Sequence, residues 1–386
     1  MSITQIDKEY VAGTYGRFPV ELLSGKGSVF TGTDGKRYID MGSGIGVTAF
    51  GTGDEEWLAA VTEQLSRLQH TSNLYYTEPC ALLAKALCEK TGMKKVFFSN
   101  SGAEANECAI KVARKYSAER KGADHYTILT LVNSFHGRTL TTLSATGQDH
   151  FHQLFNPLTP GFVHVPANDC AALEAAVAEG KIAGILLETV QGEGGVLPLT
   201  KDFIQTAAKL ARDNDIPLMI DEVQTGNGRT GKLYGYMHFD IQPDIVSTAK
   251  GLGGGLPIGA TLMNEKMQSV LGPGDHGSTY GGNPVCCAGA LSVIRRLDDR
   301  FLAEVQTKSE YIFSQLTGAE GIESVSGLGL MIGIETKRPA KDVVMDCMAK
   351  GVLCLTAKTK VRLLPPLNIP MDLLEEAIAI IKQVCK

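Results

Sequence analysis

The sequence has no long hydrophobic run and no cluster of basic residues. No stretch approaches the roughly 18 consecutive apolar residues that a membrane-spanning helix needs, and the formal net charge is −5 over 386 residues. Lys and Arg form no basic run that would attract nucleic acid or an anionic membrane. Residues 1–18 are polar and partly acidic, unlike a signal or transit peptide. We therefore expect a cytoplasmic protein that binds neither nucleic acid nor membranes.

The nine cysteines lack the spacing of a metal site. No CxxC pair occurs, and the adjacent Cys286 and Cys287 suit neither a zinc knuckle nor an ordinary disulfide. Cysteines scattered through apolar segments are typical of reduced core residues in a cytosolic protein. We therefore predict reduced cysteines and no metal site.

The middle of the chain alternates short apolar runs with helical patterns, which predicts an α/β fold with a mainly parallel sheet. A helix is predicted at Ala103–Arg120. Each strand is followed at once by Gly-rich or polar residues, and ligands of open α/β sheets bind beyond the carboxyl ends of the strands. We therefore expect one active site at that edge. The predicted strands are Lys95–Ser99, Thr127–Leu131, Ile185–Glu188, Pro217–Ile220 and Ile245–Thr248.

The two ends of the chain have a different pattern. Residues 27–40 predict two strands around a Thr-Asp-Gly turn. After about residue 285 the pattern predicts a helix, short strands and a final amphipathic helix from Met371. We expect both ends to build a smaller α+β domain, with residues 1–50 and 285–386 flanking a large domain at 51–284.

Gly226–Gly231 (GNGRTG) matches a dinucleotide-binding pattern and nearly matches a P-loop. However, no helical pattern follows, and Leu233 stands where a P-loop needs Ser or Thr. The preceding Asp221 and Glu222 would also repel a pyrophosphate. We therefore predict turns here and no dinucleotide site.

Ser101, Gly102 and Ala103 lie between a predicted strand and a predicted helix. One interpretation is a capping box, in which Ser101 and Glu104 satisfy the first N–H groups of the helix. The other is a phosphate site, because Gly102 allows close approach and the helix dipole favours an anion. The two interpretations are compatible.

Asp221 and Lys250 each follow a predicted strand. Taken alone, Asp221 could simply cap a turn. A lysine beside a glycine-rich stretch, such as Lys250, does not by itself identify a function. A pyridoxal cofactor, however, needs a lysine for an imine, a carboxylate at its ring nitrogen and an anion site for its phosphate. Asp221, Lys250 and the segment 101–103 meet these requirements together.

Nearly the whole chain resembles the class III (ornithine/acetylornithine) aminotransferases of fold type I. The resemblance implies a fold type I transferase that depends on pyridoxal 5′-phosphate. The family often has a proline where Thr189 stands and a His-x-His-Pro run at 51–54, and these departures affect loop shape. The matching segments are YGRFPV (15–20), HTSNLYYTEP (70–79), SNSGAEANE (99–107), NSFHGRT (133–139), ETVQGEGGV (188–196), IDEVQTGNGRTG (220–231), AKGLGGGLPIGA (249–260), GSTYGGNP (277–284) and RLLPPL (362–367).

The resemblance also implies which residues contact the cofactor ring. Lys250 would form the internal aldimine and then act as base and acid in the 1,3-proton shift. Asp221 would pair with the pyridinium nitrogen, and Gln224 would hydrogen-bond the phenolic oxygen. Phe135 and Val223 would lie on either side of the ring.

The phosphate would be held at Ser101, Gly102 and Ala103. By the same resemblance, Thr279 of a neighbouring subunit would complete this site. The resemblance therefore implies a homodimer with shared active sites.

Two arginines match the carboxylate-binding positions of the family. Arg138 would bind the distal carboxylate of the substrate, and Arg362 the α-carboxylate of glutamate; the guanidinium group suits both. Glu193 would pair with Arg362 when no α-carboxylate is there and would swing away for glutamate. Ser278 is a further expected substrate contact.

Ile45 bears on the choice of amine. Ornithine-specific relatives have a tyrosine in the segment aligned with residues 42–48, where it contacts the free α-amino group. Ile45 offers no partner to an ammonium and leaves room for an acyl group, and Arg17 in YGRFPV also resembles the acetylated-substrate branch. The favoured reaction is ping-pong transfer of the ω-amino group of N2-acetylornithine to 2-oxoglutarate, in arginine biosynthesis. Ornithine, N-succinyl-diaminopimelate and 4-aminobutyrate stay alternatives.

Two other functions compete with this interpretation. A decarboxylase or racemase could use the same fold, but paired arginines favour an aminotransferase with two substrates. A non-catalytic sensor would be expected to lose Lys250 or Asp221, and the chain has both.

Overall fold

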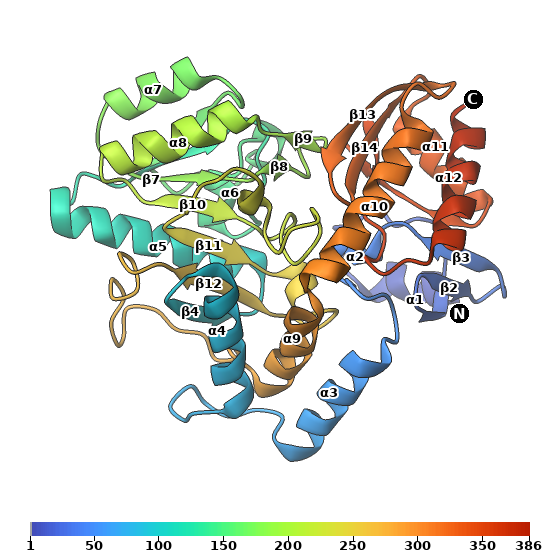
Figure 1. Cartoon of the computed structure of the whole chain (residues 1–386), viewed down its shortest axis with the longest axis horizontal. Coiled ribbons are helices and arrows are strands. Elements are labelled where there is room, and N and C mark those ends of the chain that lie inside the picture. The colour runs from blue at the N-terminus through green and yellow to red at the C-terminus, as the bar shows by residue number, and fades with distance from the viewer. Residues whose placement is uncertain (1) are drawn as a thin grey trace.

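A seven-stranded sheet forms the centre of the larger part of the molecule (Figure 1). The computed structural model describes residues 2–386. The strand order is β4-β12-β11-β10-β7-β5-β6. Strand β12 runs antiparallel to both of its neighbours, whereas β11, β10, β7, β5 and β6 pair in parallel. The strands are β4 (Lys95–Ser99), β5 (Thr127–Leu131), β6 (Phe162–Val165), β7 (Ile182–Leu187), β10 (Leu218–Asp221), β11 (Ile245–Thr248) and β12 (Gly259–Met263).

The α/β fold and its mainly parallel sheet are confirmed. Strands β4, β5 and β11 have the predicted bounds, and β7 and β10 differ from prediction by one to three residues at their ends. Strands β6 and β12 were not predicted. Strand β12 begins with Gly259 and Ala260, which have low β-propensity, although the whole strand is buried.

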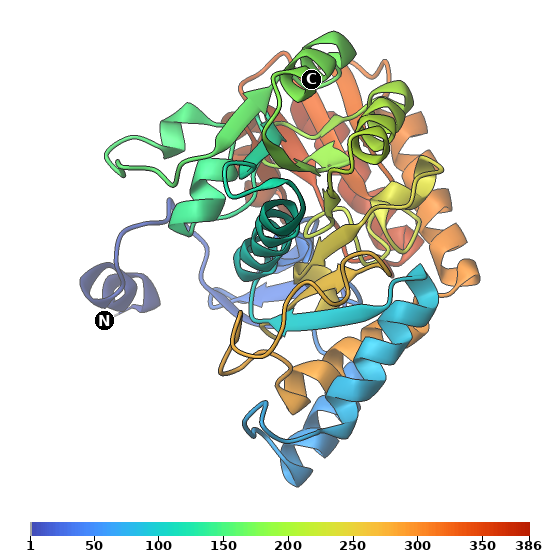
Figure 2. The ribbon, with the colours of Figure 1, turned by 90° about the vertical axis from the view of Figure 1, so that its left-hand side faces the viewer.

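The two faces of the sheet are covered by different helices (Figure 2). Because side chains alternate along a strand, the sheet contributes to two separate clusters. The side chains that pack with α5 (Gly102–Lys121) are Ile128, Leu186, Met219 and Ile245. Those that pack with α7 (Cys170–Ala178) and α8 (Lys201–Asp213) are Leu129, Leu187, Ile220 and Val246. The helix predicted at Ala103–Arg120 is confirmed as α5.

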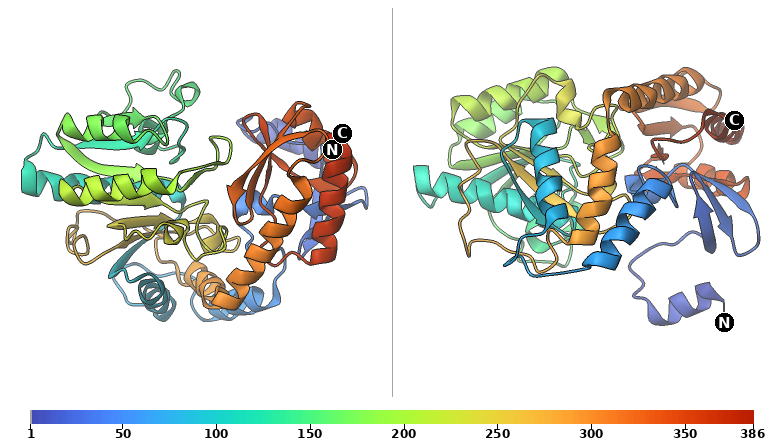
Figure 3. Two further views of the ribbon diagram at one scale, coloured as in Figure 1. Left: turned by 45° about the horizontal axis from the view of Figure 1, so that its top comes forward. Right: turned by 60° about the horizontal axis from the view of Figure 1, so that its bottom comes forward.

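The two ends of the chain lie together in the smaller part of the molecule (Figure 3, left). Strand β15 (Val352–Leu353) pairs in parallel with β3 (Arg37–Asp40), next to β2 (Val29–Gly32) and β1 (Leu22–Lys26). This pairing supports one smaller domain built from both ends, as predicted. The boundaries at residues 50 and 285 stay a proposal.

A second four-stranded sheet and several helices complete the smaller part. The short strands predicted after about residue 285 are present as β14, β15, β16 and β17, whereas β13 was not predicted. The final helix from Met371 is confirmed. These elements are β13 (Ile322–Leu328), β14 (Met331–Thr336), β16 (Leu355–Ala357), β17 (Lys360–Leu363), α10 (Asp299–Leu316), α11 (Ala340–Ala349) and α12 (Met371–Cys385).

Shorter elements connect these parts. Helices α3 and α4 pack against α9, while α1 has no buried residue and lies apart from the body (Figure 3, right). Within residues 2–386, no helix is both long and apolar enough to cross a membrane. The connecting elements are α1 (Ile3–Tyr10), α2 (Ser43–Gly46), α3 (Glu55–Arg67), α4 (Glu78–Thr91), α6 (Leu140–Ala145), α9 (Pro284–Arg296), β8 (Val190–Gln191) and β9 (Leu197–Pro198).

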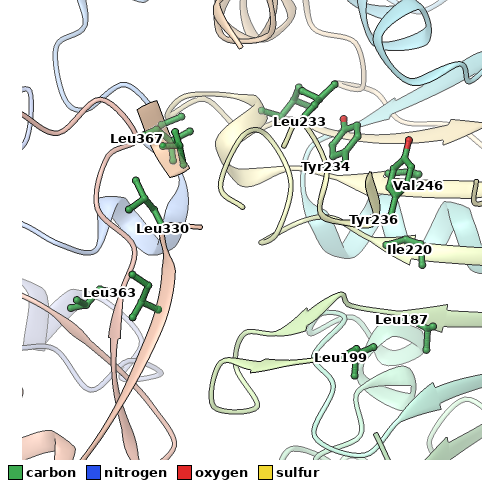
Figure 4. Close-up of a cluster of buried hydrophobic side chains, with 14 of the residues drawn as sticks. Leu187, Leu199, Ile220, Leu233, Tyr234, Tyr236, Val246, Leu330, Leu363 and Leu367 are labelled. Atoms are coloured by element: carbon green, nitrogen blue, oxygen red, sulfur yellow. The ribbon is translucent and has the colours of Figure 1, made fainter. Parts of the chain in front are cut away.

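One buried apolar cluster extends from the sheet into the C-terminal part (Figure 4). Ile220 and Val246 contribute from β10 and β11, and Leu330 and Leu367 contribute from the other side. Tyr234 lies between them on the segment that follows GNGRTG. This shared core fixes the C-terminal part beside the carboxyl ends of the strands.

Candidate active site

A cavity of about 630 Å³ lies at the carboxyl ends of the parallel strands. Residues that follow β4, β5, β7 and β11, together with the end of β10, line it, and this is the edge where the sequence predicted an active site. Of the residues predicted from the sequence, the cavity brings together Ser101, Gly102, Ala103, Phe135, Arg138, Asp221, Val223, Gln224 and Lys250.

Asp221 is the last residue of β10, and its carboxylate is held on several sides. Asn106 Nδ2 donates to Asp221 Oδ2 at 2.7 Å, and His136 Nδ1 lies 2.8 Å from the same oxygen. The backbone N–H of Val223 donates to Oδ1 at 3.0 Å. Since an ionised carboxylate only accepts hydrogen bonds, His136 must donate from Nδ1. Asp221 is therefore a fixed negative charge at the cavity wall.

Lys250 follows β11 by two residues and begins a short 3₁₀ turn. Its φ of +46° is uncommon for any residue but glycine, and such conformations often mark functional sites. Burial lowers the pKa of Lys250, although the carboxylate of Glu193 opposes this effect. The amine therefore loses its proton more readily than an exposed lysine would.

The beginning of α5 forms another wall of the cavity. Ser101 is the N-cap, and its hydroxyl accepts from the backbone N–H of Glu104 at 3.2 Å. A Cβ on Gly102 would lie 2.6 Å from Val223 Cγ1, so only glycine permits this close approach. The Ser101 half of the predicted capping box is confirmed. The Glu104 half differs, because its carboxylate accepts from the backbone N–H of Asn100 at 2.7 Å.

Phe135 and Arg138 come from the loop that follows β5. The backbone N–H of Phe135 donates to Glu188 Oε2 at 2.9 Å, which fixes the loop against the end of β7. The guanidinium carbon of Arg138 lies 3.8 Å from the ring centroid of Phe151 and 5.3 Å from that of Phe135. Arg138 is exposed at the rim of the cavity, available to an anion.

Arg362 and Glu193 form an ion pair beside Gln224. Arg362 Nη1 donates to Glu193 Oε1 at 2.5 Å and to Gln224 Oε1 at 3.1 Å. Arg362 is buried, and its Nε has no hydrogen-bond partner among residues 2–386. Burial on its own would raise the pKa of Glu193, but the charge and hydrogen bond of Arg362, together with the charge of Lys250 and the hydrogen bond from Gln224, lower it overall. The pairing predicted for Glu193 is thus present in the structure.

Five predicted residues do not line the cavity: Arg362 and Glu193, which pair beside the cavity-lining Gln224, and also Ile45, Ser278 and Thr279. Ile45 is 41% exposed and adopts a φ of +66°, while Val47 of the same loop lines the cavity. Ser278 Oγ accepts from Asn100 Nδ2 at 3.1 Å, and Asn100 itself lines the cavity, so Ser278 contacts a residue of the cavity wall. Thr279 is exposed and lies outside the cavity of its own chain.

The sequence did not single out three buried residues at the cavity: Asn106, His136 and Glu188. Burial, and next the negative charge of Asp221, raise the pKa of Glu188 well above its usual value. Glu188 lies at the carboxyl end of a predicted strand, as Asp221 does, so its position was a usable signal. Asn106 lies one helical turn beyond Gly102, on the same face of α5.

These residues fit pyridoxal phosphate. The cavity contains a helix N-terminus that favours an anion, and Gly102 adds no side chain there, which lets Val223 pack against it. Asp221 supplies a fixed negative charge suited to a protonated ring nitrogen. Lys250 supplies an amine of lowered pKa in the same cavity.

Comparison with known sequences agrees with this fit. The family model of the class III aminotransferases matches residues 10–385. The chain is 52% identical over 384 residues to the acetylornithine aminotransferase of Haemophilus ducreyi, covering 99% of this chain and 98% of that protein. It is 42% identical over 385 residues to the acetylornithine aminotransferase of Methanocaldococcus jannaschii, covering 98% and 96%.

Solved structures extend the comparison. The ornithine aminotransferase from Toxoplasma gondii matches with a TM-score of 0.94 and 31% identity, covering 99% of this chain and 94% of that one. The N-acetylornithine aminotransferase from Stenotrophomonas maltophilia matches with a TM-score of 0.86 and 32% identity, covering 99% and 98%. A second Toxoplasma structure contains pyridoxal phosphate at partial occupancy in its active site. The chain therefore belongs to the class III aminotransferases, and it is an enzyme that depends on pyridoxal phosphate.

Proposed function

We propose that the enzyme transfers the ω-amino group of N2-acetylornithine to 2-oxoglutarate, giving N-acetylglutamate 5-semialdehyde and glutamate in arginine biosynthesis. The observation that carries this proposal is the buried Arg362, which pairs with Glu193 beside the cavity-lining Gln224, together with the exposed Arg138 at the cavity. Arg362 can bind a substrate that places an α-carboxylate near it. When a substrate has no carboxylate at that position, Glu193 pairs with Arg362 instead. Relatives that are 39–52% identical and named acetylornithine aminotransferases support the choice of amine.

We assign the cofactor contacts to residues of the cavity. Ser101, Gly102 and Ala103 would hold the phosphate, joined by Thr279 of a second subunit. Asp221 would hold the ring nitrogen. The contacts with the ring faces and the phenolic oxygen would come from Phe135, Val223 and Gln224. When bound, pyridoxal phosphate supplies a carbonyl that condenses with amines and a ring that withdraws electrons.

Lys250 would move the proton in each half-reaction. Its Nζ would take a proton from the carbon that bears the amino group being transferred, and the lowered pKa of the amine favours this role. Asp221 would keep its charge throughout, because Asn106, His136 and Val223 hold the carboxylate. The two half-reactions give ping-pong kinetics.

Arg362 and Glu193 would handle the two substrates in turn. While N2-acetylornithine is bound, Glu193 stays on Arg362, and the substrate's own carboxylate binds Arg138. Glutamate brings an α-carboxylate that replaces Glu193 on Arg362, so one negative charge substitutes for another. Glu193 is partly exposed and can move, whereas Arg362 is buried.

We expect Glu193→Ala to impair the ω-amine half-reaction more than the glutamate half-reaction. Without Glu193, Arg362 is an unmasked cation that draws the substrate carboxylate away from Arg138. A roughly tenfold loss corresponds to one charged hydrogen bond. Single-turnover absorbance measurements with each substrate report the two rates separately. Glu193→Gln removes the charge while keeping the size of the side chain, so it shows which of the two matters. Equal losses in both half-reactions would contradict the proposed switch.

We propose that Ile45 and Val47 favour an acylated amine. Both are apolar, Val47 lines the cavity, and neither offers a partner to a free ammonium. The rival is ornithine, because the Toxoplasma enzyme with the high structural similarity is an ornithine aminotransferase. In that reaction the free α-amino group would need a polar contact in the segment 42–48.

A panel of amines with 2-oxoglutarate tests this choice. We expect kcat/KM for N2-acetylornithine to exceed that for ornithine by about tenfold or more, since an unpaired buried ammonium is costly. N-succinyl-diaminopimelate and 4-aminobutyrate complete the panel. A higher kcat/KM for any of these three amines would replace N2-acetylornithine as the substrate.

We also propose a cytoplasmic homodimer. Thr279 is exposed, and Tyr280 beside it is 61% exposed. Asn73 Nδ2 donates to the carbonyls of Ser278 and Gly281, which brings the exposed Leu74–Tyr76 segment next to this loop. A patch of large exposed apolar side chains is typical of an interface, and here it adjoins the residue expected to reach the other subunit's site.

A further inference from the structure

The turn GNGRTG, which resembles a dinucleotide motif, lies at the junction between the two parts of the molecule. Arg229 of this turn is buried, with 2% of its surface exposed. Its Nη1 donates to the carbonyls of Leu330 at 3.1 Å and Pro365 at 2.6 Å. Its Nη2 donates to Ser43 Oγ at 3.4 Å. One guanidinium thus links three chain segments to the large domain.

Two of the linked segments carry substrate-recognition residues of the proposed function. Ser43 begins the loop that carries Ile45 and Val47. Pro365 lies three residues after Arg362. The two segments are also bonded to each other, because Ser43 Oγ donates to the carbonyl of Leu364 at 2.5 Å. The Arg229 side chain therefore bonds both to the segment that carries Ile45 and Val47 and to the segment that follows Arg362.

The loop that Ser43 begins has an unfavourable backbone conformation. Ser43 has a φ of +41° and Ile45 a φ of +66°, flanked by Gly44 and Gly46 in the same left-handed region. For a β-branched residue such as Ile45 this conformation is a genuine outlier. Such conformations persist only where the surroundings hold them. The contacts of Ser43 are therefore needed to keep Ile45 and Val47 in place.

The loop that begins at Ser43 contacts the buried cation of Arg229. Burial lowers the pKa of Arg229 to about 9, and the nearby Asp40 carboxylate opposes this shift. Asp40 Oδ1 accepts from the backbone N–H groups of Gly42 at 2.9 Å and Ser43 at 2.7 Å. Burying a charge is costly, and an apolar side chain would pack here without that cost. The guanidinium instead supplies directed bonds that an apolar side chain lacks.

We infer, on the basis of the proposed function, that Arg229 is a positioning residue. It sets amine selectivity by holding the loop 43–47 at a fixed position relative to Arg362. Loss of the link releases the loop from its left-handed conformation. Val47 then shifts from its place on the cavity wall, and Ile45 moves with it. The glutamate half-reaction depends less on this loop, because Arg362 itself stays in β17.

Ser43→Ala and Arg229→Lys test this role. Ser43→Ala removes one contact of the guanidinium, and Arg229→Lys keeps the cation but loses the fork that reaches separate acceptors. Ser309→Ala is the matched control, because the buried Ser309 hydroxyl donates to the carbonyl of Gly329 at 2.7 Å in the same region without contacting Arg229. Melting temperature and circular dichroism check the fold of each variant.

We expect the ratio of kcat/KM for N2-acetylornithine to that for ornithine to fall about tenfold in Ser43→Ala and Arg229→Lys, as loss of a charged hydrogen bond predicts. The change should lie mainly in KM for the amine, with the glutamate half-reaction within about threefold of wild type. Ser309→Ala should keep the wild-type ratio. If Arg229→Lys fails to fold, Ser43→Ala decides the question.

Hydrogen exchange gives a readout that needs neither cofactor nor turnover. The N–H groups of Gly46 and Val47 donate to the carbonyls of Gly42 and Ser43, and their exchange should accelerate in Ser43→Ala but not in Ser309→Ala. Equal losses for all substrates, or unchanged exchange in the loop, would overturn the inference. A wild-type enzyme that prefers ornithine would overturn the proposed substrate instead, while the exchange result would still decide the role of Arg229.

Discussion

Replacing Lys250 with alanine should lower kcat by at least about 10⁴-fold, the upper range for loss of a general acid–base residue. Lys250 is the lysine of the cavity, and burial lowers its pKa, which suits both covalent attachment of the cofactor and proton transfer. No other lysine lines the cavity among residues 2–386, so none can replace it. A coupled assay for glutamate formation measures the loss.

Covalent attachment gives an independent measurement of the same residue. Borohydride reduction of the wild-type holoenzyme should add the cofactor mass to the peptide that contains Lys250, and no peptide of Lys250→Ala should gain it. Lys232→Ala is a suitable control, because Lys232 is an exposed lysine of a nearby turn. Labelling of a different lysine in the wild type would contradict the assignment.

The position of Lys250 could be predicted from sequence because the strand before it is a short, β-branched apolar run. Strand β11 has the predicted bounds, and Lys250 follows it by two residues. Asp221 is the last residue of the neighbouring strand β10. In a parallel sheet the carboxyl ends lie at one edge, so two residues far apart in sequence could be placed at one site without knowledge of side-chain geometry.

The contacts that hold these residues could not be predicted in this way. Asn106 and His136 lie 115 and 85 residues from Asp221, and their bonds depend on how α5 packs on the sheet. Helical periodicity places Asn106 on the same face as Gly102 but says nothing of the distance to β10. Side-chain hydrogen bonds between distant segments leave no periodic signal in the sequence.

The Arg362–Glu193 pair was predicted from family resemblance rather than from spacing. The two residues are 169 positions apart and belong to different parts of the molecule. For Arg229, the sequence showed the motif GNGRTG but did not predict the role of the arginine within it. Only the folded chain brings the turn against Ser43 and Pro365.

Replacing Asp221 with asparagine should lower kcat on the order of 10³-fold, as loss of a preorganised charge at a reacting group does. The carboxylate accepts from Asn106 and Val223, and from His136 once Nδ1 carries the proton. Asparagine has one acceptor oxygen, so its amide group must face either a neighbouring donor or the cofactor nitrogen. Either arrangement removes the negative charge that would hold that nitrogen protonated.

Asp244→Asn makes the same chemical change at the opposite end of the sheet and serves as the control. Asp244 accepts from Leu218 N and Asn264 Nδ2 at 2.9 and 2.8 Å, away from the cavity. We expect its kcat to stay close to wild type. Asp221→Asn should also bind pyridoxal phosphate more weakly in a fluorescence titration, since the ring nitrogen loses its charged partner. A kcat of Asp221→Asn within about tenfold of wild type would show that the ring nitrogen does not depend on this carboxylate.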